Sequence, residues 1–356
     1  MQHQPNIIIF NPDSYRGDVL GHLGNRGAVT PNIDQFVADD AVSYRNAFAQ
    51  NPVCTPSRCS FMTGLYPHVH GHRSMKHLLR PHERHLFNVL RENGYFTWWG
   101  GKNDLLAIDE GLDYDDQCDV RYNAQSSMEG VVYPTVDEDW MDGAFYRGVI
   151  DTSACTQTPA DNDTTVVNGA VEFIRSAPDN KPFFMFLALG NPHPAYQVED
   201  FYLGDIDVDK LPPRILPPDD LSTLPPVISA LHDCLPTRDV TDDQWREVKR
   251  IYYGMCTKID SLFGKIVDAL KEQDIYDDTL LIFMSDHGDF TGDYSLPEKT
   301  HSTLQDALIN VPFVVKPPKG TDVSPGVRDD LIELIDMSAT IYDMAGLTPD
   351  YDCQGI

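Results

Sequence analysis

The sequence predicts an α/β fold in which a large, mainly parallel β-sheet carries helices on both faces. Short apolar runs of the length expected for buried strands recur along the chain, and segments with helix start and stop signals separate them. Strands that alternate with helices indicate a parallel sheet whose two faces are covered.

The apolar runs define five expected strands, at residues 6–10, 96–99, 182–189, 279–284 and 311–315. Four helices are expected between them, beginning at Thr30-Pro31 and covering 82–93, about 162–176 and about 241–273. Pro31 suits the first helical turn, Gly94 suits a helix end, and Thr241 with Gln244 fits a capping box.

Two segments fit this alternation poorly and are expected to be excursions over one edge of the sheet. Residues 104–160 are rich in Asp, Tyr and Gly, and residues 192–240 are rich in Pro and Asp. Loops of this length in a compact domain commonly carry function. We therefore expect one catalytic domain over residues 1–356 with two functional excursions.

The charge balance argues against two classes of partner. The formal net charge is −28, so the molecule repels phosphate backbones and anionic lipid surfaces, and we expect neither nucleic acid nor membrane as a partner. No apolar run approaches the roughly 20 residues needed to cross a bilayer. A small anionic substrate is still compatible, because a pocket can be locally basic.

The N-terminal segment and the cysteines predict a cytoplasmic protein. MQHQPNIIIF enters an apolar strand without a charged leader or cleavage site. The seven cysteines are an odd number without CxxC spacing, which favours reduced thiols over a disulfide framework.

Polar residues follow the expected strands where each strand ends. Asp13 follows the first strand, Lys102 the strand at 96, His193 the strand at 182, and Asp286-His287 the strand at 279. Ligands of open parallel sheets bind beyond the carboxyl ends of the strands, so these side chains should meet at one rim.

Three of these residues form a candidate metal site. Singly, an Asp after a strand is often a helix cap and a His is often an ordinary polar residue, but Asp286 and His287 adjoin a tight turn at Gly288. Together with Asp13 they would offer oxygen ligands and one nitrogen. Calcium fits the oxygens, whereas the imidazole leaves manganese or zinc open.

The stretch CTPSRC, residues 54–59, gives the site a candidate reactive residue. Thr55 is expected to cap a helix with Pro56 in its first turn, which places residue 54 at a helix N-terminus, where anions bind. Arg58 adds a charge suited to a tetrahedral oxyanion. An unmodified Cys54 at that point is expected to be a low-pKa thiol.

These motifs resemble those of the formylglycine-dependent sulfatases, members of the alkaline phosphatase superfamily. Cys54 to Arg58, followed by Phe61-Met62-Thr63-Gly64, is similar to the motif whose cysteine a maturation enzyme oxidises to formylglycine. Residues 94–102 resemble the second signature of the family. The resemblance extends over most of the chain, and its further segments are 6–18, 30–34, 192–194, 285–288, Lys299 and the last helix up to Ala345-Gly346.

The resemblance implies roles for these residues. Asp13, Asp286, His287 and residue 54 would hold one divalent metal, for which Ca²⁺ is favoured. Arg58, Lys102 and Lys299 would bind the sulfate and the modified residue, and His193 would lie beside the leaving-group oxygen. The formylglycine hydrate would attack sulfur, and His193 or Lys299 would protonate the departing alcohol.

The chain departs from the family pattern at three places. Ser14 stands where many members have a second acidic ligand, and Asn103-Asp104 stands where a histidine usually follows Lys102. We assign Asn103, Asp104 and, close to Lys299, His301 as substrate-binding candidates. The chain ends about where the family continues into a small antiparallel C-terminal subdomain, which is expected to be missing here.

Several conspicuous residues are interpreted as structural. His68, His70 and His72 are expected to belong to a packed turn, Trp98 and Trp99 to core or pocket wall, and Cys59 to the buried side of its helix.

The sequence thus predicts a sulfatase that acts on a small anionic sulfate ester, with a sulfated carbohydrate favoured over an aryl sulfate. A phosphonate monoester hydrolase or phosphodiesterase of the same superfamily is the nearest alternative. A non-catalytic metal-dependent binding protein, in which Cys54 is never oxidised, is the alternative from a different class.

Overall fold

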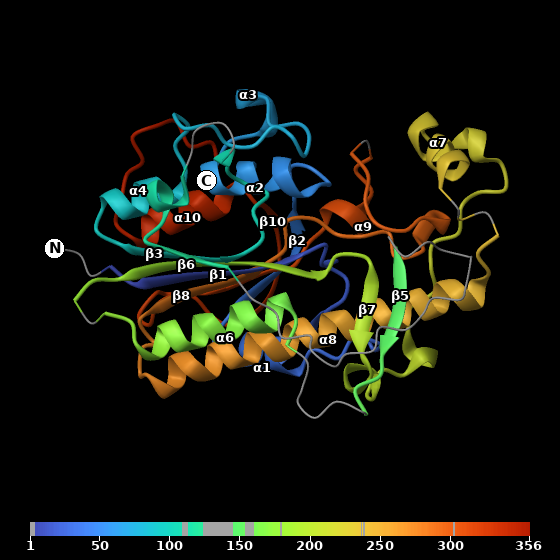
Figure 1. The fold of residues 1–356 in the computed structure, drawn as a ribbon, viewed down its shortest axis with the longest axis horizontal. Coiled ribbons are helices and arrows are strands. Elements are labelled where there is room, and N and C mark those ends of the chain that lie inside the picture. The colour runs from blue at the N-terminus through green and yellow to red at the C-terminus, as the bar shows by residue number, and fades with distance from the viewer. Residues whose placement is uncertain are drawn as a thin grey trace.

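The computed structural model describes residues 4–108, 113–123, 145–153, 160–178, 180–235, 237, 239–301 and 303–356. Its centre is an eight-stranded sheet (Figure 1), whose strands in sheet order are β10 (Gly326–Glu333), β2 (Val42–Phe48), β9 (Phe313–Lys316), β8 (Thr279–Met284), β1 (Asn6–Asp13), β6 (Phe183–Pro192), β3 (Phe96–Gly101) and β4 (Val120–Tyr122). β9 runs antiparallel to both of its neighbours, and the other neighbouring pairs are parallel. The predicted mainly parallel sheet is confirmed.

The middle strands are apolar on both faces because both faces are covered. Side chains alternate along β1, so Ile8 and Phe10 enter one core while Ile7 and Ile9 enter the other. All four are fully buried. The continuous apolar run therefore predicted a central strand correctly.

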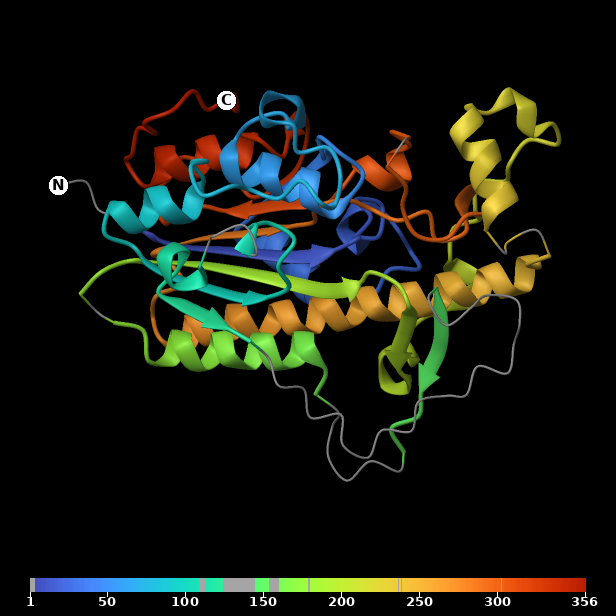
Figure 2. The same cartoon turned by 45° about the horizontal axis from the view of Figure 1, so that its top comes forward.

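Three helices cover one face of the sheet: α1 (Pro31–Asp39), α6 (Asn162–Arg175) and α8 (Asp242–Glu272). The opposite face carries α2 (Cys54–Thr63), α4 (Leu86–Glu92) and α10 (Asp336–Met344), as Figure 2 shows from a second direction. The capping box of Thr241 and Gln244 is present at the start of α8. α4 is shorter than expected, because His85 is its N-cap and residues 82–84 lie outside it.

The remaining elements belong mostly to the two excursions. A separate parallel pair is formed by β5 (Tyr146–Ile150) and β7 (Tyr196–Glu199). The short helices are α3 (Pro67–His70), α5 (Tyr114–Gln117), α7 (Pro226–Cys234) and α9 (Asp306–Ile309), with 3₁₀ turns at Gly21–Leu23, Asp200–Leu203, Val208–Lys210, Leu221–Thr223 and Asp293–Ser295. The second excursion therefore holds secondary structure of its own. Much of the first, residues 109–112, 124–144 and 154–159, lies outside the described residues.

Of the residues interpreted as structural, Trp98, Trp99, Cys59 and His72 are packed, whereas His68 and His70 are exposed, so the expectation of a packed turn is wrong for those two histidines. Trp98, Trp99 and Cys59 are buried, and the ring of His72 bonds to Glu83 and to the His77 carbonyl. The six cysteines within the described residues are all free thiols, and Cys155 lies outside those residues. Among the described helices, none combines the length and the apolar character that a membrane span requires.

Gly101, the last residue of β3, allows the chain to turn toward the carboxyl edge of the sheet. Its φ is +94°, and an added Cβ would lie 1.9 Å from the Ala188 carbonyl oxygen. The same carbonyl accepts a hydrogen bond of 2.9 Å from the Lys102 N–H. A side chain at residue 101 would thus collide with the backbone that places Lys102.

We predict that Gly101→Ala lowers the free energy of unfolding by about 3 kcal/mol or more, because conformational cost and a backbone collision add together. Gly94→Ala is the matched control, since Gly94 has a φ of +92° but no atom within 4 Å of an added Cβ. It should cost only about 1 kcal/mol. Urea denaturation measures both, and equal losses would contradict the role given to the Ala188 carbonyl.

Candidate active site

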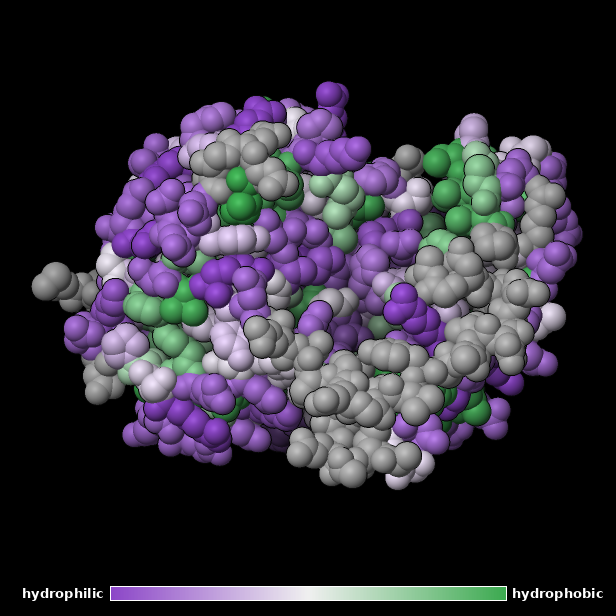
Figure 3. Space-filling view, viewed as in Figure 1, coloured by the Kyte–Doolittle hydropathy of each residue, from purple (hydrophilic) through white to green (hydrophobic). Residues whose placement is uncertain are grey.

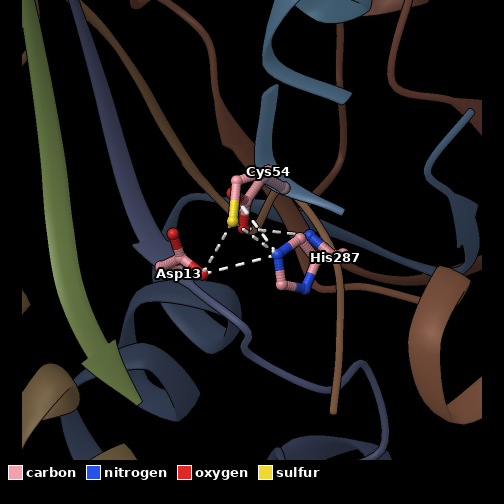
Figure 4. A group of neighbouring side chains, drawn as sticks. Asp13, Cys54 and His287 are labelled. Carbon is pink, nitrogen blue, oxygen red and sulfur yellow. Dashed lines mark hydrogen bonds and ion pairs between the residues drawn. The ribbon is translucent and has the colours of Figure 1, made fainter. Parts of the chain in front are cut away.

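The strand ends converge on one cluster, as the sequence predicts. Asp13 ends β1, Asp286 and His287 follow β8, and Cys54 is the first residue of α2. Figure 4 shows the side chains of Asp13, Cys54 and His287 pointing toward one another. The ligand atoms of all four residues lie within 4.8 Å of one another, and all four are buried.

The close contacts show how tightly the cluster is built. The Cys54 Sγ is 3.1 Å from the His287 Nε2 and 3.7 Å from the Asp13 Oδ1. The His287 Nε2 is 3.4 Å from the Asp13 Oδ1 and 3.8 Å from the Asp286 Oδ2. A divalent cation could be bound here by two carboxylates, one imidazole and one side-chain atom of residue 54, which surround a single point.

His287 is prepared to be a ligand. Its Nδ1 lies 2.8 Å from the Gly288 carbonyl oxygen, so that nitrogen donates its proton there and Nε2 keeps its lone pair. Burial lowers the pKa of His287 in spite of the neighbouring Asp286. The neutral ring is the form that binds a metal.

Positive charge holds the two carboxylates in place. The Arg58 Nη2 donates to the Asp13 Oδ2 at 2.9 Å and its Nε donates to the Asp286 Oδ2 at 2.8 Å. The Lys102 Nζ lies 2.5 Å from the same Asp13 oxygen. Burial alone would raise the pKa of Asp13, but Lys102, His193 and Arg58 together hold it well below its usual value. Asp13 is therefore ionised inside the protein.

The helix that carries Cys54 starts two residues earlier than the sequence predicts. Its N-cap is Val53, and Thr55 lies inside the first turn with Pro56, so Thr55 is not the cap. The expectation of a low-pKa thiol is also wrong. Burial, with Asp13 and Asp286 nearby, raises the pKa of the Cys54 thiol well above its usual value, and these effects exceed the attraction of Lys102. The N-terminal position of a helix does not outweigh the effects of burial and of two adjacent carboxylates on the pKa of this thiol.

A second group of side chains lies next to the first. The Nδ1 of His193 is 2.5 Å from the Pro194 carbonyl oxygen, and its Nε2 contacts the Lys299 Nζ. The Glu298 Oε1 is 2.6 Å from the Lys299 Nζ and 3.4 Å from the His193 Nε2. His193 and Lys299 thus form a pair. Glu298 contacts both of them, and the sequence did not predict this third residue.

The residues at which the chain departs from the family pattern have different surroundings. The Ser14 Oγ donates to the Asp13 Oδ1 at 3.0 Å, so it supports a candidate ligand. Asp104 forms an ion pair of 2.8 Å with Lys102. The Asn103 Oδ1 instead accepts hydrogen bonds from the N–H groups of Leu105 and Leu106, and the Asn103 Nδ2 donates to the Leu106 carbonyl. The Asn103 side chain therefore stabilises its own loop. His301 is exposed.

Asp163, also missed from the sequence, fixes the strand end that leads to His193. It is 4% exposed and accepts hydrogen bonds from the Gly190 N–H, the Asn191 N–H and the Asn191 amide, at 2.6–2.7 Å. In the sequence, Asp163 looks like an ordinary acidic residue in the first turn of a helix, so it gave no signal of this role.

A cavity of about 430 Å³ opens beside His193 and Lys102. Most of its lining side chains are polar, and they include Lys102, Asp161, Asn162, Asp163, Asn191, His193, Gln197, Glu199 and Lys258. Lys258 is held between Asp161 at 2.8 Å and Glu199 at 2.7 Å. On the face of the molecule that Figure 3 draws, hydrophilic residues predominate in the middle, whereas hydrophobic residues gather over α7.

Fold and site together define the class: this is an α/β protein with a mainly parallel sheet and a cluster of four potential metal ligands at the strand ends. The sulfatase family model matches residues 5–347, and the chain belongs to that family. Arylsulfatase K of Danio rerio is 24% identical over 363 residues. That alignment covers 97% of this chain, and the chain spans 65% of the length of that relative.

Solved structures share the fold. Phosphonate monoester hydrolase of Agrobacterium radiobacter has a TM-score of 0.80 at 23% identity, covering 99% of this chain and 76% of that one. A structure described as a complex with its substrate D-glucosamine-2-N,6-O-disulfate has a TM-score of 0.69 at 18% identity, covering 99% and 79%.

We predict that Arg58→Lys lowers the free energy of unfolding by about 3 kcal/mol, because a lysine offers no planar fork and leaves one buried carboxylate uncompensated. Arg45→Lys is the matched control, since Arg45 pairs with Asp329 at the surface and is 47% exposed. It should change stability by less than about 0.5 kcal/mol. Chemical denaturation without added metal measures both, and a small effect at Arg58 would contradict its structural role.

Proposed function

We propose that the protein hydrolyses sulfate esters, with a formylglycine hydrate derived from Cys54 as the nucleophile. The observation that carries the proposal is the place of Cys54. It opens α2 within the maturation motif, and its Sγ lies against Asp13 and His287. A formylglycine-generating enzyme is the partner that this proposal requires.

The described side chains would have different roles in the reaction. Asp13, Asp286 and His287 would hold the divalent metal, which when bound supplies charge that polarises the sulfuryl oxygens. The modified residue 54 supplies the attacking hydroxyl. Arg58 and Lys102 hold the carboxylates in place, and the Lys102 ammonium is partly exposed, so it can bind a sulfuryl oxygen.

The other half of the site suits the leaving group. His193 lines the polar cavity and contacts Lys299, and the ester oxygen of a bound substrate would depart beside this pair. Protonation of that oxygen by a positioned side chain makes an alcohol a better leaving group.

We propose a sulfated carbohydrate as the substrate. The carboxylates, amides and ammonium groups of the cavity can donate to and accept from hydroxyl groups of a sugar, and its volume suits a small ligand. A structural neighbour with a sulfated glucosamine as its substrate supports this choice, and the arylsulfatase relative keeps aryl sulfates as useful assay substrates.

We also propose Ca²⁺ as the metal and the cytoplasm as the location. The two carboxylates favour a hard cation with oxygen ligands. The free thiols of the described residues suit a reducing compartment.

The direct test compares 4-nitrophenyl sulfate with a matched aryl phosphate diester and an aryl phosphonate, using protein made with a co-expressed maturation enzyme. We expect the sulfate to have the highest kcat/KM. Cys54→Ala should lower that rate by roughly 10⁴-fold or more, because the nucleophile is removed.

Mass spectrometry of the tryptic peptide 46–58 is the control for this test, since it shows whether the Cys54 thiol has become an aldehyde. A faster phosphonate or diester, in protein with the aldehyde, would replace the sulfatase assignment by the phosphonate hydrolase alternative. Binding of sulfate esters without turnover in that same protein would favour the binding-protein alternative.

Metal removal gives an independent prediction. Chelation should lower sulfate-ester hydrolysis by at least about 100-fold, because the charge that stabilises the sulfuryl oxygens is lost, and Ca²⁺ should restore the rate. Asp286→Asn should not be restored at the same Ca²⁺ concentration, because one carboxylate ligand is gone. Restoration by Mn²⁺ or Zn²⁺ alone would contradict the calcium assignment, and an unchanged rate after chelation would contradict metal dependence.

A further inference from the structure

Glu298 connects the two residues on the leaving-group side of the site. Its Oε1 lies 2.6 Å from the Lys299 Nζ and 3.4 Å from the His193 Nε2, so one carboxylate oxygen faces both nitrogen atoms. The Lys299 side chain is 8% exposed and that of Glu298 is 29% exposed. An ion pair of neighbouring residues at the surface would contribute little, but this one is fixed at the edge of a reaction site.

The hydrogen bonds of His193 locate the proton of the pair. A carbonyl oxygen can only accept, so the Nδ1 that lies 2.5 Å from the Pro194 oxygen carries the hydrogen. The Nε2 therefore has a free lone pair and accepts from the Lys299 ammonium, which it contacts. In this arrangement Lys299 holds the transferable proton and His193 orients it.

The backbone holds Glu298 in an uncommon conformation. Its φ is +57°, a value that residues other than glycine seldom adopt. The Glu298 N–H donates to the Tyr196 hydroxyl at 2.9 Å, and its carbonyl accepts from the Phe290 N–H at 2.8 Å. The Tyr196 hydroxyl in turn donates to the Asp289 Oδ1 at 2.6 Å.

This support is rigid because its members are buried. Tyr196, Asp289 and Phe290 are all 0% exposed. Uncommon backbone conformations persist where the surrounding structure determines them, and they concentrate at functional sites. The buried contacts thus fix the point from which the Glu298 carboxylate reaches Lys299.

We propose that Glu298 is a positioning residue for leaving-group protonation: its carboxylate keeps the Lys299 ammonium on the His193 Nε2 and in reach of the ester oxygen. This inference rests on the proposed sulfatase function. As the bond between sulfur and the ester oxygen breaks, its electron pair stays on that oxygen, which takes a proton from the Lys299 Nζ and leaves as the alcohol. The neutral amine then regains a proton from water.

The test compares a substrate that needs protonation with one that does not. The leaving group of 4-nitrophenyl sulfate needs little help, whereas that of phenyl sulfate resembles a tyrosine side chain, with a pKa of about 10. In Glu298→Ala and Glu298→Gln, kcat on phenyl sulfate should fall by roughly 30- to 100-fold, and kcat on 4-nitrophenyl sulfate by less than about threefold. A merely structural residue would lower both rates equally.

Glu272→Gln is the matched control, because Glu272 pairs with Arg175 at 2.8 Å at the end of α8 and both side chains are more than half exposed. Its two rates should equal those of the wild type. Thermal unfolding of each variant shows whether the protein is folded at the assay temperature.

A second measurement does not depend on activity. In protein labelled with ¹⁵N-histidine, the His193 Nε2 should give the signal of a hydrogen-bonded acceptor in the wild type. It should move toward that of an unbonded acceptor in Glu298→Ala and stay unchanged in Glu272→Gln.

The outcomes separate the two proposals. A wild type that hydrolyses other esters but no sulfate refutes the sulfatase function, and the His193 signal then decides whether Glu298 holds the pair. An active wild type whose Glu298 variants keep the ratio of the two rates, or an Nε2 signal that Glu298→Ala leaves unchanged, overturns the positioning role.

Discussion

Two carboxylates buried side by side are the constraint on which the rest of this molecule depends. The ligand atoms of Asp13 and Asp286 lie within 4.8 Å of each other, and both residues are fully buried. At that separation two unit charges repel by about 3–4 kcal/mol with an effective dielectric constant of about 20, before the cost of removing both from water. The pair is stable only with positive charge beside it. Arg58 supplies that charge in this structure and binds β1 and β8 to α2.

The apolar middle of the sheet makes this arrangement possible. β1, β6 and β8 are buried along nearly their whole length, so polar groups gather beyond the strand ends. Parallel strands place those ends at one edge, and the cluster therefore unites residues far apart in the sequence. At this edge the two carboxylates lie beside residue 54, whereas His193, which contacts Lys299, lines the polar cavity.

The parts that could be predicted from the sequence are those that depend on local pattern. Apolar runs revealed the central strands, and residues after strand ends revealed Asp13, Asp286 and His287. β10 could not be predicted, because it is a sheet edge in which half of the residues are charged and none is buried. Glu298 and Asp163 gave no local signal either, since their roles depend on contacts with residues distant in sequence. The N-cap at Val53 and the raised pKa of Cys54 depend likewise on three-dimensional packing and charge.

The molecular charge of −28 and an anionic substrate are compatible because charge acts at two length scales. Exposed charges are screened beyond roughly 10 Å at ordinary ionic strength, whereas the cations at the site act at contact distance in a desolvated setting. Arg58, Lys102 and Lys299 are all largely withdrawn from water. Local charge at the site can thus attract an anion even though the molecule as a whole is strongly negative.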